Sequence, residues 1–261
     1  MPRTIVITGA SSGLGEALAL RYAREPNSRL GLIGRNRERL ENVAQRCRDV
    51  GAAVSVAAID VRSRAMMEDW LRRFDDENPI DLLIANAGVM TGSVAAGEIE
   101  PAEIAYQLVE INVLGVLNTV QPVVSRMIAR GRGQIAIMSS IAGFVPLPDA
   151  PSYGASKAAA LNYGLALREL LQPRGIKVSV VCPGYVSTAM MHQESGSKPF
   201  AMPPDRAAEL IERGLAQDRA IITFPTFFAL LTRLSGLLPD WLRRRTNAPF
   251  RFTVKNRDLR D

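Results

Sequence analysis

The sequence of 261 residues has one histidine, His192, and two cysteines. Histidine is the usual side chain for moving protons near neutral pH, so an acid/base enzyme of this composition must use another group. Cys47 lies in a helical pattern and Cys182 ends an apolar run, which makes both core thiols rather than a disulfide framework. Neither C-x-x-C nor H-E-x-x-H occurs, and we predict no metal site.

The N-terminus also lacks a charged segment followed by an apolar one and a cleavage site, and we expect a cytoplasmic protein. The net charge of +6 is concentrated at the other end, because residues 241–261 hold seven Lys/Arg and two acidic residues, a local +5. The remainder carries +1, which argues against a nucleic-acid partner.

Short apolar runs rich in β-branched residues alternate with segments of helical spacing. Continuous hydrophobicity is typical of strands covered on both faces of a sheet. We therefore predict an α/β fold, a doubly wound Rossmann-type parallel sheet of about seven strands with helices on both faces. No repeat or linker divides the chain, and we expect one domain over residues 1–261. The predicted strands lie in 4–8, 29–34, 53–59, 80–85, 133–139, 176–182 and 219–224.

A glycine-rich stretch, VITGASSGLGEA, joins the first predicted strand to a helical segment. Gly9 permits a tight turn, Gly13 lets the backbone approach a pyrophosphate, and Gly15 lets the helix pack close to the sheet. In this context the pattern indicates a dinucleotide site, and the alternative is a glycine-rich turn without a ligand.

The end of the second strand, GLIGRNRER, bears on coenzyme choice. A fold that prefers NAD places an acidic side chain here. Gly34 supplies no carboxylate to repel a 2′-phosphate, and Arg35 supplies a guanidinium to pair with one. This favours NADP(H) over NAD(H), unless Arg35 is a solvated charge at the helix entry.

Residues 151–160, PSYGASKAAA, offer the missing proton-transfer group. Tyr153 precedes Lys157 by four residues. On a helix this spacing brings both side chains to one face, about 5 to 6 Å apart at Cβ. A nearby ammonium favours the phenolate, so the pair could exchange protons with a substrate. The alternative is a surface Tyr and Lys on an alanine-rich helix.

Taken together, these residues resemble the short-chain dehydrogenase/reductase family, in its compact single-domain branch. The motifs TGASSGLG, ANAG, YGASK and PGYVST occur in the family's order over about residues 3–190. The resemblance implies that Tyr153 is the acid/base, that Lys157 lowers its pKa and holds the nicotinamide ribose, and that Ser140 bonds the reacting oxygen. Asn112 would anchor a water beside Lys157. Ser139 is the weaker candidate for the catalytic serine.

The resemblance also implies which residues contact the cofactor. Two positions depart from the family pattern: Ser12 stands where many NADP-preferring members carry a basic residue, and Ala85 replaces the first Asn of NNAG. Asp60 has an alternative role as a helix cap. The implied contacts are Gly9, Ser11, Ser12, Gly13, Leu14, Gly15, Arg35, Asn36, Asp60, Val61, Asn86, Ala87, Gly88, Tyr153, Lys157, Pro183, Gly184, Val186 and Thr188.

The segment at about 188–215 corresponds to the family's variable lid. Its Met190, Met191, Phe200 and Met202 suit a lipophilic or bulky substrate, and ordinary packing is the alternative. We interpret His192 as an exposed lid residue rather than a catalyst.

An amphipathic and basic extension follows at about 224–261. Its longest uncharged run, 220–232, has thirteen residues, fewer than the about 20 that a bilayer requires. Three interpretations remain open: a cover for the substrate site or a subunit interface, a membrane helix at the inner surface, and a docking site for an acidic carrier. Arg243, Arg244 and Arg245 follow an apolar side formed by Phe227, Leu230, Leu231, Leu234, Leu237, Leu238 and Trp241.

We therefore expect an NADP(H)-dependent carbonyl reductase or alcohol dehydrogenase with a small-molecule substrate. The alternative is a cofactor-binding regulatory or scaffold protein, against which the complete set of Asn112, Ser140, Tyr153 and Lys157 argues. A sugar-nucleotide epimerase of the extended branch fits less well. The resemblance further implies a homodimer or homotetramer, formed through the helices around 103–130 and 152–172.

Overall fold

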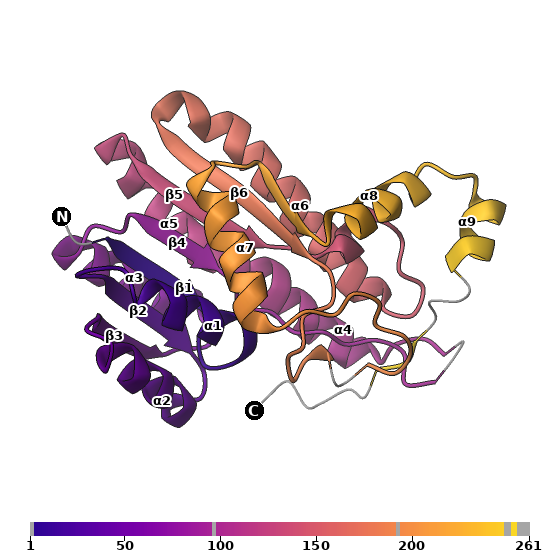
Figure 1. Ribbon diagram of the computed structural model, residues 1–261, viewed down its shortest axis with the longest axis horizontal. Helices are drawn as coiled ribbons and strands as arrows, with labels where there is room; N and C mark the ends of the chain where they lie inside the picture. The colour runs from indigo at the N-terminus through magenta and orange to yellow at the C-terminus, as the bar shows by residue number, and fades with distance from the viewer. Residues whose placement is uncertain (1–2, 96–97, 192–193, 248–251, 255–261) are drawn as a thin grey trace.

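The structure is a computed structural model that describes residues 3–95, 98–191, 194–247 and 252–254. Within these residues, seven strands form one parallel sheet in the order β3-β2-β1-β4-β5-β6-β7 (Figure 1). Each strand overlaps one of the predicted apolar runs, and the predicted fold class is confirmed. The strands are β1 (Thr4–Thr8), β2 (Arg29–Gly34), β3 (Ala53–Ala58), β4 (Leu82–Ala85), β5 (Gly133–Met138), β6 (Ile176–Pro183) and β7 (Ile221–Phe224).

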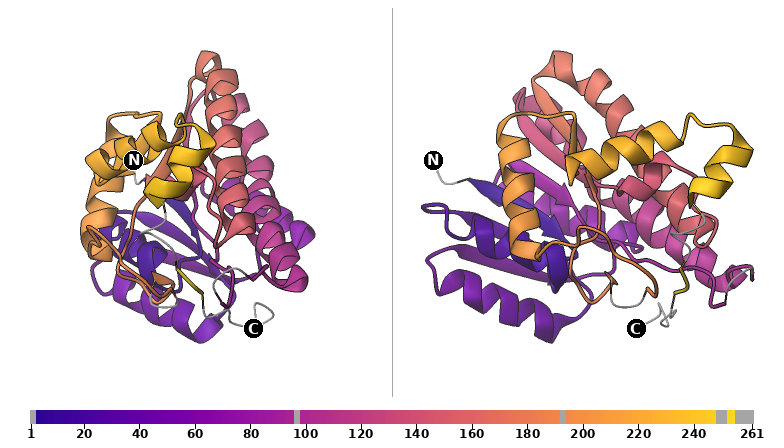
Figure 2. Two further views of the ribbon diagram at one scale, coloured as in Figure 1. Left: turned by 90° about the vertical axis from the view of Figure 1, so that its right-hand side faces the viewer. Right: turned by 45° about the vertical axis from the view of Figure 1, so that its right-hand side comes forward.

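Helices cover both faces of this sheet, as the left view of Figure 2 shows. Helices α1 (Gly13–Tyr22), α2 (Arg37–Arg48) and α7 (Pro204–Ala216) bury their apolar sides in one core with residues of β1 and β2. Helices α3 (Arg64–Glu77), α5 (Gly115–Arg130) and α6 (Pro151–Leu171) bury theirs in a second core on the opposite face. Strand order reverses between β1 and β4, which is where sheets of this type bind ligands.

A continuous helical stretch leads to α5. It begins with α4 (Ala102–Val109), passes through the π-helical turn η1 (Glu110–Leu114) and ends at Arg130. By length and composition this stretch is apolar enough to cross a membrane. Its inner side, however, packs in the second core, as expected of a core helix in an α/β domain.

The C-terminal extension differs from the single helix that its apolar spacing suggests. Helix α8 (Thr226–Ser235) and helix α9 (Asp240–Asn247) are separate, because Gly236 and Pro239 interrupt helical propensity. Both lie at one end of the molecule (Figure 1). Helix α8 packs against η2 (Ile141–Phe144), where the Arg233 guanidinium lies 4.9 Å from the Phe144 ring centroid.

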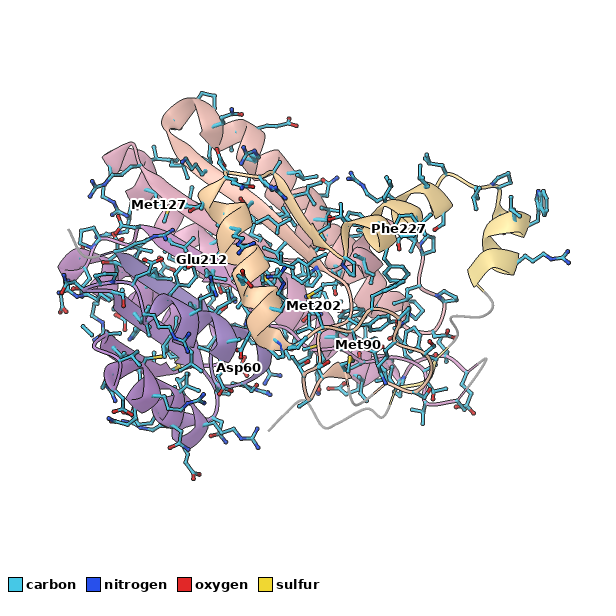
Figure 3. All side chains as sticks on the ribbon, in the orientation of Figure 1. Asp60, Met90, Met127, Met202, Glu212 and Phe227 are labelled. Atoms are coloured by element: carbon cyan, nitrogen blue, oxygen red, sulfur yellow. The ribbon has the colours of Figure 1, made fainter. Side chains whose placement is uncertain are left out.

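The predicted apolar side of this extension faces away from the protein. Leu230 and Leu234 are 54% and 51% exposed, so about half of each side chain is left uncovered by the described residues. Phe227, labelled in Figure 3, is 67% exposed. The side chains of Arg243 and Arg244 and the tail 255–261 lie outside the described residues.

Candidate active site

The predicted catalytic residues meet at the carboxyl end of β5. Ser140 follows this strand, and the first turns of α6 present Tyr153 and Lys157 toward it. Tyr153 and Lys157 are 9% and 7% exposed, which excludes the alternative of a surface Tyr and Lys pair. The Lys157 Nζ lies 5.7 Å from the centroid of the Tyr153 ring.

The two neighbouring serines have different surroundings. Ser139 is buried, and its hydroxyl donates to the Lys157 carbonyl oxygen at 2.6 Å, so it fixes β5 to α6. Ser140 is partly exposed; its Oγ donates to the Pro183 carbonyl oxygen at 3.4 Å and accepts the Ala142 N–H at 3.1 Å, and hydrogen bonding with it lowers the pKa of Tyr153. The geometry therefore favours Ser140 as the serine that meets the substrate.

Asn112 lies in the π-helical turn, and its side chain joins two parts of the site. Its Oδ1 accepts the Val89 N–H at 2.8 Å, and its Nδ2 donates to the Val89 carbonyl at 2.9 Å and to Ser156 Oγ at 3.1 Å. A Cβ at Gly88 would lie 3.1 Å from Asn112 Oδ1 and 3.2 Å from Lys157 Nζ. Asn112 thus ties the segment after β4 to α6 beside the lysine.

Burial controls the ionisation of Tyr153 and Lys157. It raises the pKa of the Tyr153 phenol, while the hydrogen bond with Ser140 lowers this pKa. Burial also lowers the pKa of Lys157 to about 8. The pKa of Tyr153 is raised overall because the loss of hydration outweighs the hydrogen bond with Ser140. That Lys157 lowers this pKa stays a prediction.

The glycine-rich loop is shaped to hold a dinucleotide. Gly9 and Gly13 have φ of +66° and +58°, in the region that favours glycine. A Cβ at Gly15 would lie 2.2 Å from the Gly9 carbonyl oxygen and 2.6 Å from Asn86 Nδ2. This crowding brings the backbone after β1 against the segment after β4, next to the N-terminus of α1. The residues present therefore fit a pyrophosphate there.

The remaining predicted cofactor residues line the same carboxyl edge of the sheet. Ser12 precedes α1 and is exposed, while Thr188 contacts the loop, its Cγ2 3.2 Å from where a Gly13 Cβ would lie. Thr8 Oγ1 accepts the N–H groups of Asn86 and Ala87, both at 3.1 Å. Ser11 belongs to the loop and Leu14 to the first turn of α1. Pro183 ends β6, and Gly184 and Val186 follow it.

A pair of arginines lies at the adenosine end of this edge, where Figure 3 labels Asp60. Arg35 is 37% exposed in its side chain, and its Nη1 lies 4.0 Å from Asp60 Oδ2. Arg62 donates to the same oxygen from Nη2 at 2.7 Å. Burial favours protonation of Asp60, but the hydrogen bonds from Arg62 hold its pKa below the usual value.

The structure also clarifies the neighbours of these arginines. Asn36 caps α2, because its Oδ1 accepts the Arg39 N–H at 2.8 Å. Asp60 is not the cap of α3, because Ser63 takes the N-cap position. Instead, Asp60 Oδ1 accepts the Arg62 N–H at 2.9 Å. Val61 is buried against Gly115. Arg62 was not predicted from the sequence, although it lies two residues beyond Asp60.

An apolar cluster surrounds the other side of Tyr153, and we call it the substrate side. The lid residue Met190 packs against it, and Met191 is buried. Phe200 is 61% exposed and lies against Phe228, with ring centroids 6.0 Å apart. His192 lies outside the described residues. The buried members are Met90, Leu108, Ala150, Tyr153, Phe252 and Val254, of which sequence analysis identified only Tyr153.

The comparisons with known proteins agree with this architecture. The family model for the short chain dehydrogenases matches residues 3–198. The chain belongs to the short-chain dehydrogenase family. It is an oxidoreductase of that family, and the predicted resemblance is confirmed.

Several members are similar over nearly the whole chain. Estradiol 17-beta-dehydrogenase 11 of Rattus norvegicus is 28% identical, with 97% of this chain and 87% of that protein covered. A short-chain dehydrogenase from Sphingobium yanoikuyae, solved in complex with NADPH, has a TM-score of 0.78 at 28% identity over 100% of both chains. The bulky-bulky ketone specific alcohol dehydrogenase from Comamonas testosteroni has a TM-score of 0.77 at 27% identity, covering 99% of this chain and 96% of that one.

Proposed function

We propose that this oxidoreductase uses NADP(H) to interconvert a lipophilic or bulky ketone and the corresponding secondary alcohol. The observation that carries the proposal is the meeting of partly exposed Ser140 with buried Tyr153 and Lys157, between the dinucleotide edge and an apolar cluster. A bound nicotinamide would supply or accept the hydride.

The protein's own groups account for the proton. In the reductive direction Tyr153 donates its phenolic proton to the carbonyl oxygen, which Ser140 orients by a second hydrogen bond. With its pKa raised by burial, the phenol carries at neutral pH the proton that the reductive direction requires. Lys157 and Asn112 hold their places beside Gly88, where the nicotinamide ribose would lie.

The preference for NADP(H) is supported by charge. Arg35 and Arg62 flank Asp60 at the adenosine end, so two guanidiniums offset one carboxylate. A 2′-phosphate placed there would form charge-assisted hydrogen bonds. The NADPH complex of the Sphingobium relative supports the same choice.

The substrate class is supported by the apolar cluster around Tyr153, which offers methionine, leucine and phenylalanine side chains. The specificity of the Comamonas enzyme for bulky-bulky ketones agrees with such surroundings. We also propose a cytoplasmic homo-oligomer formed through the α4–α5 stretch. Tyr106, Val109 and Leu114 support it, because these apolar residues on that stretch are 72%, 39% and 48% exposed.

The test is NADPH consumption with a panel of aryl, alicyclic and 3-oxoacyl thioester ketones, with NADPH binding followed by fluorescence. We expect turnover of bulky apolar ketones by the wild type. A protein that binds NADPH but reduces none of them would instead support the non-catalytic scaffold.

A further inference from the structure

Residues 252–254 return to the active site from the far end of the chain, and we call them the strap. The N–H of the first strap residue donates to Asp149 Oδ2 at 3.2 Å, and that of the third donates to the Ser93 carbonyl at 3.0 Å. The Ser195 N–H donates to the carbonyl of the middle residue at 2.9 Å. The strap therefore joins the segment after β4, the segment before α6 and the lid.

The strap also packs against the catalytic tyrosine. Phe252 and Val254 are 9% and 1% exposed and share an apolar cluster with Tyr153. A Cβ at Gly92 would lie 2.9 Å from Val254 Cγ2, so the strap and the segment after β4 are in close contact. The strap therefore belongs to the apolar surroundings of Tyr153 and is hydrogen-bonded to the lid at Ser195.

Glu194 is the lid residue that the strap holds. It forms an antiparallel bridge with Val254. Directly paired residues of an antiparallel bridge project their side chains to the same side, so the Glu194 side chain lies beside Val254, which is buried in the apolar cluster that holds Tyr153. The Glu194 charge raises the pKa of the Tyr153 and Tyr185 phenols. Within the described residues, the carboxyl oxygens have no hydrogen bond or ion pair; Lys198 Nζ donates to the Glu194 backbone carbonyl instead, at 2.8 Å.

We propose that the Glu194 carboxyl group is a substrate-binding subsite beside the catalytic tyrosine, which takes an O–H or N–H donor of the substrate and rejects a carboxylate or phosphate. The subsite rests on the proposed function, and it refines the substrate class to a bulky ketone with a neutral or cationic donor group. A partly buried carboxylate without a partner gains a charge-assisted hydrogen bond from such a donor. An anion at the same place meets like charge in a poorly hydrated site.

The test uses four aryl methyl ketones that differ only in the para substituent, which is propyl, hydroxyethyl, aminoethyl or carboxyethyl. The hydroxyl and ammonium compounds distinguish a neutral from a cationic donor. Wild type, Glu194→Gln and the control Glu169→Gln are compared by kcat/KM with NADPH; Glu169 is exposed on the distal part of α6. Thermal unfolding and NADPH binding verify that each variant is folded.

For the wild type we expect the carboxyethyl ketone to be at least about tenfold poorer than the propyl ketone, since like charge in a site of low dielectric costs more than about 1.4 kcal/mol. At least one donor ketone should exceed the propyl ketone. Glu194→Gln should remove most of the carboxylate penalty, and Glu169→Gln should keep it. If the ratios of kcat/KM among the four ketones are the same in the wild type and in Glu194→Gln, the subsite proposal is wrong. If no ketone is turned over by any of the proteins, the proposed function itself is wrong.

A pH profile gives a second readout that a structural role would not move. The titratable groups that interact with the Glu194 carboxyl are the phenols of Tyr153 and Tyr185 and the ammonium of Lys198. Burial raises the pKa of Glu194 to about 7, and once ionised it raises the pKa of Tyr153. Glu194→Gln should therefore shift the acid limb of kcat/KM for oxidation of the propyl alcohol to lower pH. An unchanged limb places Glu194 away from Tyr153 and overturns the proposal.

Discussion

The cofactor side and the substrate side of this active site are built in different ways. On the cofactor side, backbone after β1 packs on backbone after β4, and a side chain at Gly15 would collide with the Gly9 carbonyl. On the substrate side, segments far apart in sequence are joined by hydrogen bonds to the strap, and side chains form the surface. The cofactor side therefore tolerates little change, whereas the substrate side is free to vary with the substrate.

The largest effect is expected at the junction of the two sides. Tyr153→Phe removes the proton donor and keeps the ring, so kcat should fall by about 10²- to 10⁴-fold, the usual contribution of a general acid. NADPH affinity should change little. Steady-state kinetics and NADPH titration measure the two quantities.

A matched control lies on the same helix. Tyr163 is partly exposed, and its hydroxyl accepts from Gln121 at 3.0 Å, remote from Ser140 and Lys157. Tyr163→Phe should keep nearly full activity. If both variants retained activity, the proton would come from another group.

The next effect tests the rigidity of the cofactor side. Gly15→Ala adds a methyl group whose carbon would lie only 2.2 Å from the Gly9 carbonyl oxygen. This oxygen belongs to the backbone and cannot rotate away as a side chain could. We expect the free energy of unfolding to fall by about 1 to 3 kcal/mol, as in other overpacked sites, with weaker NADPH binding. Thermal unfolding with and without NADPH is the measurement, and unchanged midpoints would show that the loop relaxes freely.

The same contrast explains what the sequence could predict. Tyr153 and Lys157 lie four residues apart, and Gly9, Gly13 and Gly15 form one local motif, so their function follows from short-range rules. The strands were recognised because β-branched runs between helical segments are typical of a parallel sheet.

The substrate side could not be predicted in this way. Phe252 and Glu194 reach Tyr153 only through the tertiary fold, and no local pattern in 252–254 indicates which residues they contact. The raised pKa of Tyr153 was also missed, because burial depends on the whole surroundings of the phenol. By contrast, the break between α8 and α9 had a local signal in Gly236 and Pro239.

A smaller effect concerns coenzyme choice. Arg35→Asp removes a guanidinium from the adenosine end and adds a carboxylate near Asp60, so NADPH should lose about 1.5 to 3 kcal/mol of binding, or about ten- to a hundredfold in Kd. The Kd for NADH should change much less. Arg37→Asp, an exposed change two residues on, is the control. An equal effect on both coenzymes would mean that Arg35 does not meet the 2′-phosphate.

The smallest effect on stability is expected at the outer face of α8. Leu230 and Leu234 are half exposed, so changing both to Glu should alter the free energy of unfolding by no more than about 0.5 kcal/mol for each substitution. Leu171, which is 1% exposed at the end of α6, is the control, and Leu171→Glu should unfold the protein.

The double variant of Leu230 and Leu234 also separates two interpretations of this face, an interface between two copies and a contact with a lipid surface. If the face joins two copies, light scattering will show that the double variant dissociates. If the face meets a lipid surface, the wild type will sediment with anionic vesicles at low salt, and an Arg243/Arg244/Arg245 triple alanine variant will stay in the supernatant. A large loss of stability in the double variant, with neither dissociation nor loss of vesicle binding, would support the interpretation of this face as a cover for the substrate site.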